Sequence, residues 1–168
     1  MAESQKKRRV VIVGAGFAGF NAARELSRLI GTSTEIVVIN STDYFLYLPL
    51  MPQVTGGLVD STHICVSLAS RLRKMRFVLG TMTHVDAQAK TLSWAGPEGS
   101  SGQLGYDRLI LTVGSVNKLL PIPGITDYAH GFRTIAEALY LRDHIIRQLE
   151  LTTRLARTLP GLAGRCPT

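Results

Sequence analysis

The sequence predicts an α/β domain in which a parallel sheet and a β-meander are flanked by helices. Three segments predict this fold: an uninterrupted β-branched run at 10–13, apolar residues at helical spacing over 21–30, and a second apolar run at 35–39. Continuous Val and Ile runs are typical of strands that are buried on both faces of a parallel sheet. Together the three segments form a βαβ unit of about 30 residues.

The chain after residue 40 departs from a simple alternation of strands and helices. Residues 41–60 indicate a long loop stiffened by proline and rich in aromatic residues, and long ordered loops are usually functional. A short helix is expected over Thr62–Lys74, with Cys65 buried in it. Further strands are expected at 77–79, 81–85, 90–94 and 106–113, and those at 81–85 and 90–94 form a meander.

In the C-terminal third, the sequence predicts a turn followed by one long helix. Pro121–Gly124 is the turn, and Thr134 with Glu137 has the spacing of a capping box, so a helix begins there and extends to about Arg157. We therefore expect a basic flexible tail at 1–8, a nucleotide-binding domain at 9–157 and a disordered tail at 158–168.

Composition narrows the class of protein. The 168 residues are 45% hydrophobic with a net charge of +7, which fits one globular domain and excludes a disordered chain. Aromatic residues do not interleave with the basic run Lys6–Arg9, so a solvated tail is favoured over a localisation signal or a phosphate-binding arm, and no nucleic-acid role is expected.

Cysteine and hydropathy patterns exclude several other classes. Cys65 and Cys166 are too few and too far apart for a disulfide scaffold, which favours a reducing, cytoplasmic setting. The four histidines fall in separate predicted elements, and no metal site is expected. No apolar run approaches the roughly 20 residues that span a bilayer, so no transmembrane segment is expected.

The most informative motif is Gly14-Ala15-Gly16-Phe17-Ala18-Gly19, a GxGxxG pattern between the first strand and the first helix. In this context Gly14 permits the tight turn, Gly16 lets the backbone approach a pyrophosphate, and Gly19 lets helix and strand pack closely. Backbone N–H groups and the helix dipole then hold the anion. The motif predicts a bound dinucleotide; the alternative is a glycine-rich turn that binds nothing.

The second strand ends in Asn40, where dinucleotide-binding folds usually place Asp or Glu on a ribose hydroxyl. An amide also hydrogen-bonds a ribose, but it lacks the charge that strengthens carboxylate bonds. We expect weaker binding on the adenosine side rather than loss of the site.

The meander distinguishes flavin from nicotinamide binding. A meander in place of one helical crossover resembles the Rossmann-like FAD-binding half of flavoproteins, and 109–115 resembles the strand that closes such domains. The segment 45–50 with Gly56-Gly57, and the segments 121–124 and 130–134, resemble type II NADH dehydrogenases of the pyridine nucleotide-disulfide oxidoreductase superfamily. The resemblance covers about residues 9–150, and it identifies the chain as similar to the N-terminal, FAD-binding part of these enzymes.

The resemblance implies a set of residues that contact FAD. The pyrophosphate would be surrounded by Gly14, Ala15, Gly16, Phe17, Ala18 and Gly19. Asn40 would stand at the ribose, and Met82 would place its backbone against the adenine. Leu48 and Pro49 would lie on the flavin side, and Gly114 would allow close approach to the cofactor. Leu48 and Val113 differ from more usual polar residues. The resemblance leaves the catalytic residues unknown.

The family activity that the resemblance implies is hydride transfer from NADH to FAD and then to a quinone. The NADH-binding domain and the C-terminal membrane-binding region of the family would follow residue 160, so this chain alone is expected to be inactive and incomplete. The alternative is a non-catalytic dinucleotide-binding fragment of a truncated gene. Cys65 has no second cysteine beside it, which excludes a dithiol mechanism. The predicted helix over 134–157 exposes apolar area suited to self-association.

Overall fold

The computed structural model describes residues 7–30, 33–116 and 118–158, and the chain divides into two compact units. The first unit comprises Met1–Leu46 with Cys65–Asn117, and the second comprises Tyr47–Ile64 with Lys118–Thr168. Residues 1–6 and 159–168 of the predicted tails lie outside the described residues. Arg8 begins a strand and Thr158 ends a helix, so neither residue belongs to a flexible tail.

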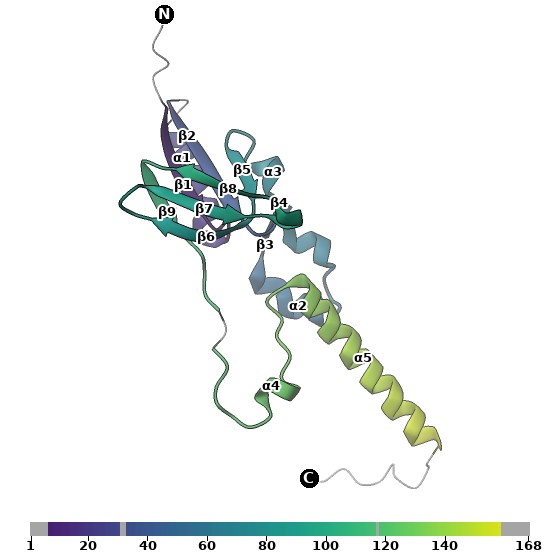
Figure 1. The fold of residues 1–168 in the computed structure, drawn as a ribbon. Helices are drawn as coiled ribbons and strands as arrows, with labels where there is room; N and C mark the ends of the chain where they lie inside the picture. The colour runs from purple at the N-terminus through teal and green to yellow at the C-terminus, as the bar shows by residue number, and fades with distance from the viewer. Residues whose placement is uncertain (1–6, 31–32, 117, 159–168) are drawn as a thin grey trace, which may run out of the picture. The chain divides into compact units, whose positions relative to one another are not determined.

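The first unit is built on a parallel sheet of four strands in the order β5-β2-β1-β9 (Figure 1). These strands are β5 (Arg76–Leu79), β2 (Thr34–Asn40), β1 (Arg8–Val13) and β9 (Arg108–Leu111). Helix α1 (Phe17–Leu29) connects β1 to β2. The parallel sheet and the βαβ unit are therefore confirmed.

Alternate residues of the central strands pack on opposite faces of the sheet. On one face Ile12 and Val38 contact side chains of α1 and α3 (Leu68–Arg71), and Ala23 and Leu68 are fully buried there. On the other face Val11 and Ile39 pack against Leu92 and Leu104 of the meander. Strands covered on both faces explain the uninterrupted Val and Ile runs in the sequence.

The meander consists of three antiparallel strands, β6 (Thr81–Asp86), β7 (Thr91–Ala95) and β8 (Ser101–Gly105). A 3-10 turn, η3 (Pro97–Gly99), lies between β7 and β8. The sequence predicts β6 and β7 but not β8. Because the segment Ser101–Gly105 is rich in glycine and places only Leu104 in the core, it lacks the pattern that signals a strand.

The helix expected over Thr62–Lys74 is wrong. The structure instead has η2 (Ser61–Ile64), then β4 (Cys65–Ser67) and the short helix α3. β4 pairs antiparallel with β3 (Tyr44–Leu46), with Phe45 opposite Val66. Cys65 is therefore a half-buried strand residue rather than a buried helix residue, and its partial desolvation raises the pKa of its thiol.

The second unit contains the rest of the segment predicted as a loop and the C-terminal helix. Its elements are η1 (Leu48–Leu50), α2 (Met51–Thr55), η2, α4 (Ile125–Tyr128) and α5 (Ile135–Thr158). α2 packs against α5, and Met51, Val54 and Ala138 are buried. Short helical turns thus replace most of the expected loop.

Helix α5 begins where the sequence predicts. The Glu137 carboxylate accepts the N–H of Thr134 at 2.9 Å, and the Thr134 hydroxyl accepts the N–H of Glu137 at 3.2 Å, which is a capping box. Further along the helix Ile146 and Leu149 expose 48% and 64% of their surface. Within the described part of the chain, no helix is both long enough and apolar enough to cross a bilayer.

Candidate functional site

The turn after β1 is held by three contacts within the first unit. The Gly14 N–H donates to Ile39 O at 2.8 Å, and Gly14 has a φ of +92°. The Thr112 hydroxyl lies 2.8 Å from the carbonyl oxygens of both Val13 and Gly14. A Cβ at Gly14 would overlap the carbonyl oxygen of Thr112. This position therefore requires glycine for its backbone angle and for its space.

Gly19 lies where α1 approaches the same turn most closely. A Cβ at Gly19 would overlap the Gly14 carbonyl oxygen and the Thr112 hydroxyl. This agrees with the packing role that the sequence predicts for the third glycine of the motif. We call Gly14, Gly19 and Thr112 the glycine junction.

Gly16 differs from the other two glycines because space is open around it. A Cβ built there meets no heavy atom within 4 Å, and Gly16, Phe17 and Ala18 are exposed. Gly16 is the N-cap of α1, no side chain caps that helix, and its first turn contains no acidic residue. Such a helix start offers backbone N–H groups and a positive dipole end to an anion. The space and the electrostatics both fit a phosphate group.

Asn40 connects the glycine motif to the end of β2. Its Oδ1 accepts the N–H of Ala15 at 2.8 Å, and its Nδ2 donates to the carbonyl and hydroxyl oxygens of Thr42 at 2.9 and 3.1 Å. The side chain thus already makes protein hydrogen bonds where a ribose contact is expected. Ala15 is 1% exposed and its N–H is used by Asn40, so Ala15 has a structural part in the site.

A cavity of about 160 Å³ lies beside this turn, at the carboxyl ends of β1 and β2. Its lining includes Gly14, Asn40, Met82 and Val113, so the structure brings together Gly14 with the expected ribose and adenine positions. Ligands of open α/β sheets bind at this edge. The volume is below the roughly 300–1,000 Å³ of a complete small-molecule site, so the cavity accounts for only part of a dinucleotide.

The remaining predicted contacts are placed separately. Gly114 follows Val113 with a φ of +75°, and a Cβ there would meet nothing within 4 Å. Leu48 and Pro49 are exposed residues of η1, in the second unit. Their contact with a flavin stays a prediction.

Sequence reasoning missed Thr112, whose hydroxyl contacts the turn from 98 positions away. The available signal was its place at the end of β9, because carboxyl ends of parallel strands meet at one edge. Sequence reasoning also assigned His130 and His144 to separate elements, but their ring centroids lie 5.2 Å apart in the second unit. Among the described residues, no three His, Cys, Asp or Glu side chains are grouped as metal ligands.

Comparison with known proteins matches one protein family to most of the chain. The family described as pyridine nucleotide-disulphide oxidoreductase matches residues 8–156. The type II NADH:quinone oxidoreductase Ndh of Mycobacterium tuberculosis is 33% identical over 156 residues, which are 91% of this chain and 33% of that protein. The external alternative NAD(P)H-ubiquinone oxidoreductase B4 of Arabidopsis thaliana mitochondria is 30% identical over 84% of this chain and 25% of its own length.

A solved structure shows the same fold. NDH2 from Plasmodium falciparum, in complex with NADH, matches 88% of this chain and 30% of its own with a TM-score of 0.79 and 26% identity. The chain therefore spans about a third or less of the length of these relatives.

Proposed function

The chain belongs to the pyridine nucleotide-disulphide oxidoreductase family, and from that premise we propose that it is the FAD-binding part of a type II NADH:quinone oxidoreductase. Bound FAD would supply the hydride-accepting chemistry of such an enzyme. The protein's contribution is to bind and orient the cofactor. The observation that carries the proposal is the open space at Gly16 beside the uncapped start of α1.

In this proposal each group of residues has a distinct task. Gly14 and Gly19 shape the turn, and the exposed backbone at Gly16, Phe17 and Ala18 faces the pyrophosphate. The cavity beside Asn40 and Met82 receives the adenosine side. Gly114, where added volume meets no protein atom, permits close approach of the cofactor. Leu48 and Pro49 would contact the flavin side.

We propose further that this chain alone does not oxidise NADH. The cavity beside Gly14 and Asn40 is about 160 Å³ and covers only part of a dinucleotide. The relatives named for NADH or NAD(P)H and quinone chemistry are about three times longer or more. A non-catalytic dinucleotide-binding fragment is the alternative, and the two proposals differ in whether turnover appears when the rest of a relative is added.

Cofactor binding is tested with the purified chain. After incubation with FAD and gel filtration, we expect the visible absorbance bands of oxidised flavin to co-elute with the protein. In the Gly16→Val variant FAD should not co-elute, because the valine side chain fills the space open to the phosphate. The far-UV circular dichroism of this variant should be unchanged. Gly105→Ala is the matched control, since a Cβ there lies 3.9 Å from Lys90 O and far from any crowding. Wild-type protein that never retains FAD would contradict the proposal.

Turnover is tested separately with NADH and a soluble ubiquinone analogue. We expect flavin-loaded protein to show no turnover alone. Activity restored by adding the remaining two thirds of a relative as a second polypeptide would support an incomplete oxidoreductase, whereas inactivity in that mixture would favour the non-catalytic fragment.

We also propose that α5 mediates self-association. Ile145, Ile146 and Leu149 expose between 45% and 64% of their surface. Sedimentation velocity should show dimers or larger species that dissociate in a variant with Ile146→Lys and Leu149→Lys.

A further inference from the structure

The parallel sheet of the first unit has a second polar edge, opposite the glycine junction. Lys7 immediately precedes β1, Thr34 begins β2, and Arg76 begins β5 opposite Val37 of β2. Because these strands are parallel, their starts all point to the side of the sheet away from the turn at Gly14. Six residues of extended strand span about 20 Å, which separates this edge from the turn at Gly14. Nothing in the proposed FAD site accounts for the residues gathered here.

A cavity of about 650 Å³ opens at this edge, larger than the cavity at the glycine junction. This volume lies within the usual range for a small-molecule site. The lining residues are three cations, two hydroxyl residues, one acid and one aliphatic residue: Lys7, Lys74 and Arg76; Ser27 and Thr34; Glu35; and Ile36. Among the described residues, no aromatic side chain lines it.

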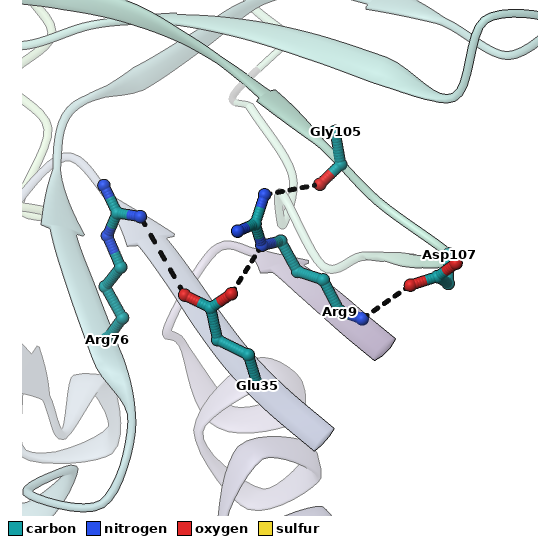
Figure 2. A network of polar contacts seen from close by, with 5 residues as sticks. All are labelled: Arg9, Glu35, Arg76, Gly105 and Asp107. Carbon is teal, nitrogen blue, oxygen red and sulfur yellow. Dashed lines mark hydrogen bonds and ion pairs between the residues drawn. The ribbon is translucent and has the colours of Figure 1, made fainter. Parts of the chain in front are cut away.

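The single acid of the cavity is already paired. Glu35 Oε2 accepts the Arg9 Nε–H at 2.7 Å, and Arg76 Nη1 lies 3.9 Å from Glu35 Oε1 (Figure 2). Arg9 donates two further hydrogen bonds. Its Nη1–H donates to Gly105 O at 3.2 Å, and its backbone N–H donates to Asp107 Oδ2 at 2.6 Å. Glu35 is therefore compensated mainly by Arg9, and it adds little uncompensated negative charge to the cavity.

The two lysines remain uncompensated. Among the residues that the structure describes, neither Lys7 nor Lys74 forms an ion pair with a carboxylate, and both are exposed. Three cations against one carboxylate give the lining a formal charge of +2. A cavity with this balance attracts an anion of comparable charge.

From this arrangement we propose that the cavity is a binding site for a phosphate-bearing small molecule, such as a sugar phosphate or a pyrophosphate. Arg76 offers a planar guanidinium for bidentate contact, and Lys7 and Lys74 act as point charges. Ser27 and Thr34 supply hydroxyl donors. The absence of aromatic side chains from the lining argues against a ligand whose base must stack. The chemistry differs from that at Gly16, where backbone N–H groups hold the phosphate.

Isothermal titration calorimetry with inorganic pyrophosphate tests the site. The whole chain is used, with FAD already present so that pyrophosphate does not also bind at the start of α1 beside Gly16. We expect one saturable site per chain, and about tenfold or greater weakening in the double variant Lys74→Gln/Arg76→Gln, because each lost charged contact contributes on that scale. FAD retention by the same variant should be unchanged.

Arg108→Gln is the matched control. Arg108 begins β9 at the same edge of the sheet and carries the same charge, but it does not line the cavity. Its replacement should change pyrophosphate affinity by less than about twofold, which is the effect of net charge alone. Should the double variant fail to fold, Lys74→Gln alone carries the test, since this exposed side chain has no ion pair among the described residues.

Two results would overturn the proposal. One is the absence of saturable heat with the wild-type chain. The other is an equal loss of affinity in Arg108→Gln and in the cavity variants, which would indicate general attraction of polyanions to a basic chain. If the wild-type chain binds pyrophosphate but does not bind FAD, the proposed cofactor site is contradicted and the anion site at this cavity is supported.

Discussion

The hydroxyl of Thr112 lies 2.8 Å from the carbonyl oxygen of Gly14, although 98 residues separate the two in the sequence. The Thr112 N–H also donates to Val13 O at 2.8 Å. Thr112 is the first residue after β9, and β9 pairs with β1. The end of one strand therefore fixes the turn that follows its neighbour, so the shape of the proposed phosphate site depends on both.

Thr112→Val should weaken both the fold and the cofactor site. The change keeps the shape of the side chain but removes the hydroxyl from two carbonyl oxygens in a partly buried position. We expect the free energy of unfolding to fall by about 1 kcal/mol and FAD affinity to fall with it. Urea unfolding and FAD fluorescence titration measure the two effects. Thr112→Ser restores the hydroxyl and should recover most of both, and a Val variant that equals wild type in both assays would refute this role.

Two glycines of the motif, Gly16 and Gly19, should respond differently to alanine. A Cβ at Gly19 overlaps the backbone carbonyl of Gly14 and the hydroxyl of Thr112, whereas a Cβ at Gly16 meets no atom within 4 Å. We expect Gly19→Ala to lower the free energy of unfolding by about 1–3 kcal/mol. Gly16→Ala should lower it by less than about 1 kcal/mol, the cost of a poorer N-cap.

Chemical denaturation of the two variants side by side makes this comparison. Gly16→Ala serves as the control, because it adds the same methyl group three residues away. Equal destabilisation by both substitutions would show that the close approach at Gly19 does not govern the packing of α1 against the sheet.

Elements with strong local signals were predictable from the sequence. The Val and Ile runs of β1 and β2 and the three glycines between them identify the βαβ unit, because burial on both faces leaves a continuous apolar pattern. The start of α5 follows from Thr134 and Glu137, whose side chains and backbone satisfy each other within four residues. In each case the interaction that decides the structure is local.

Elements decided by distant partners were not predictable. Cys65 and Val66 are extended because they pair with Leu46 and Phe45, and Leu68 N–H donates to Asp43 O at 2.8 Å. Apolar spacing over 62–74 carries no sign of that pairing and indicates a helix instead. The same holds for β8, which depends on the register of β7. Asn40 was identified by its place at the end of β2, but its bond to Ala15 needed the folded turn.

Asn40→Ala should destabilise the first unit as well as the site. It removes the acceptor of the Ala15 N–H and two contacts to Thr42, and it leaves the N–H of a residue that is 1% exposed without that partner. An unsatisfied buried donor costs about 1–3 kcal/mol, so we expect a loss of that size in the free energy of unfolding. Ser41→Ala, at the neighbouring cavity-lining position, should change it by less than about 0.5 kcal/mol. Similar unfolding curves for the two variants would contradict the assigned role.

The start of α5 should weaken at acidic pH. The Glu137 carboxylate accepts the backbone N–H of Thr134 at 2.9 Å and that of Arg133 at 2.8 Å, and these bonds lower the pKa of Glu137 below its ordinary value. The pKa of Glu137 is lower in the folded state than in the unfolded state, where it is about 4. The ionised carboxylate therefore stabilises the fold fully at pH values above about 4, and this contribution is lost as the pH falls through the folded-state pKa.

Far-UV circular dichroism during an acid titration, with NMR of the Glu137 side chain, measures this effect. Helix content should begin to decrease as the pH falls below about 4, and Glu137→Gln should have lower helix content at neutral pH with a smaller acid-induced change. Glu150→Gln removes the same charge from the exposed face of α5 and should leave the Glu137 titration in place. If the Glu137 resonance titrates at the ordinary value of a free glutamate, the two backbone bonds do not hold the carboxylate in solution, and the capping box does not account for where α5 begins.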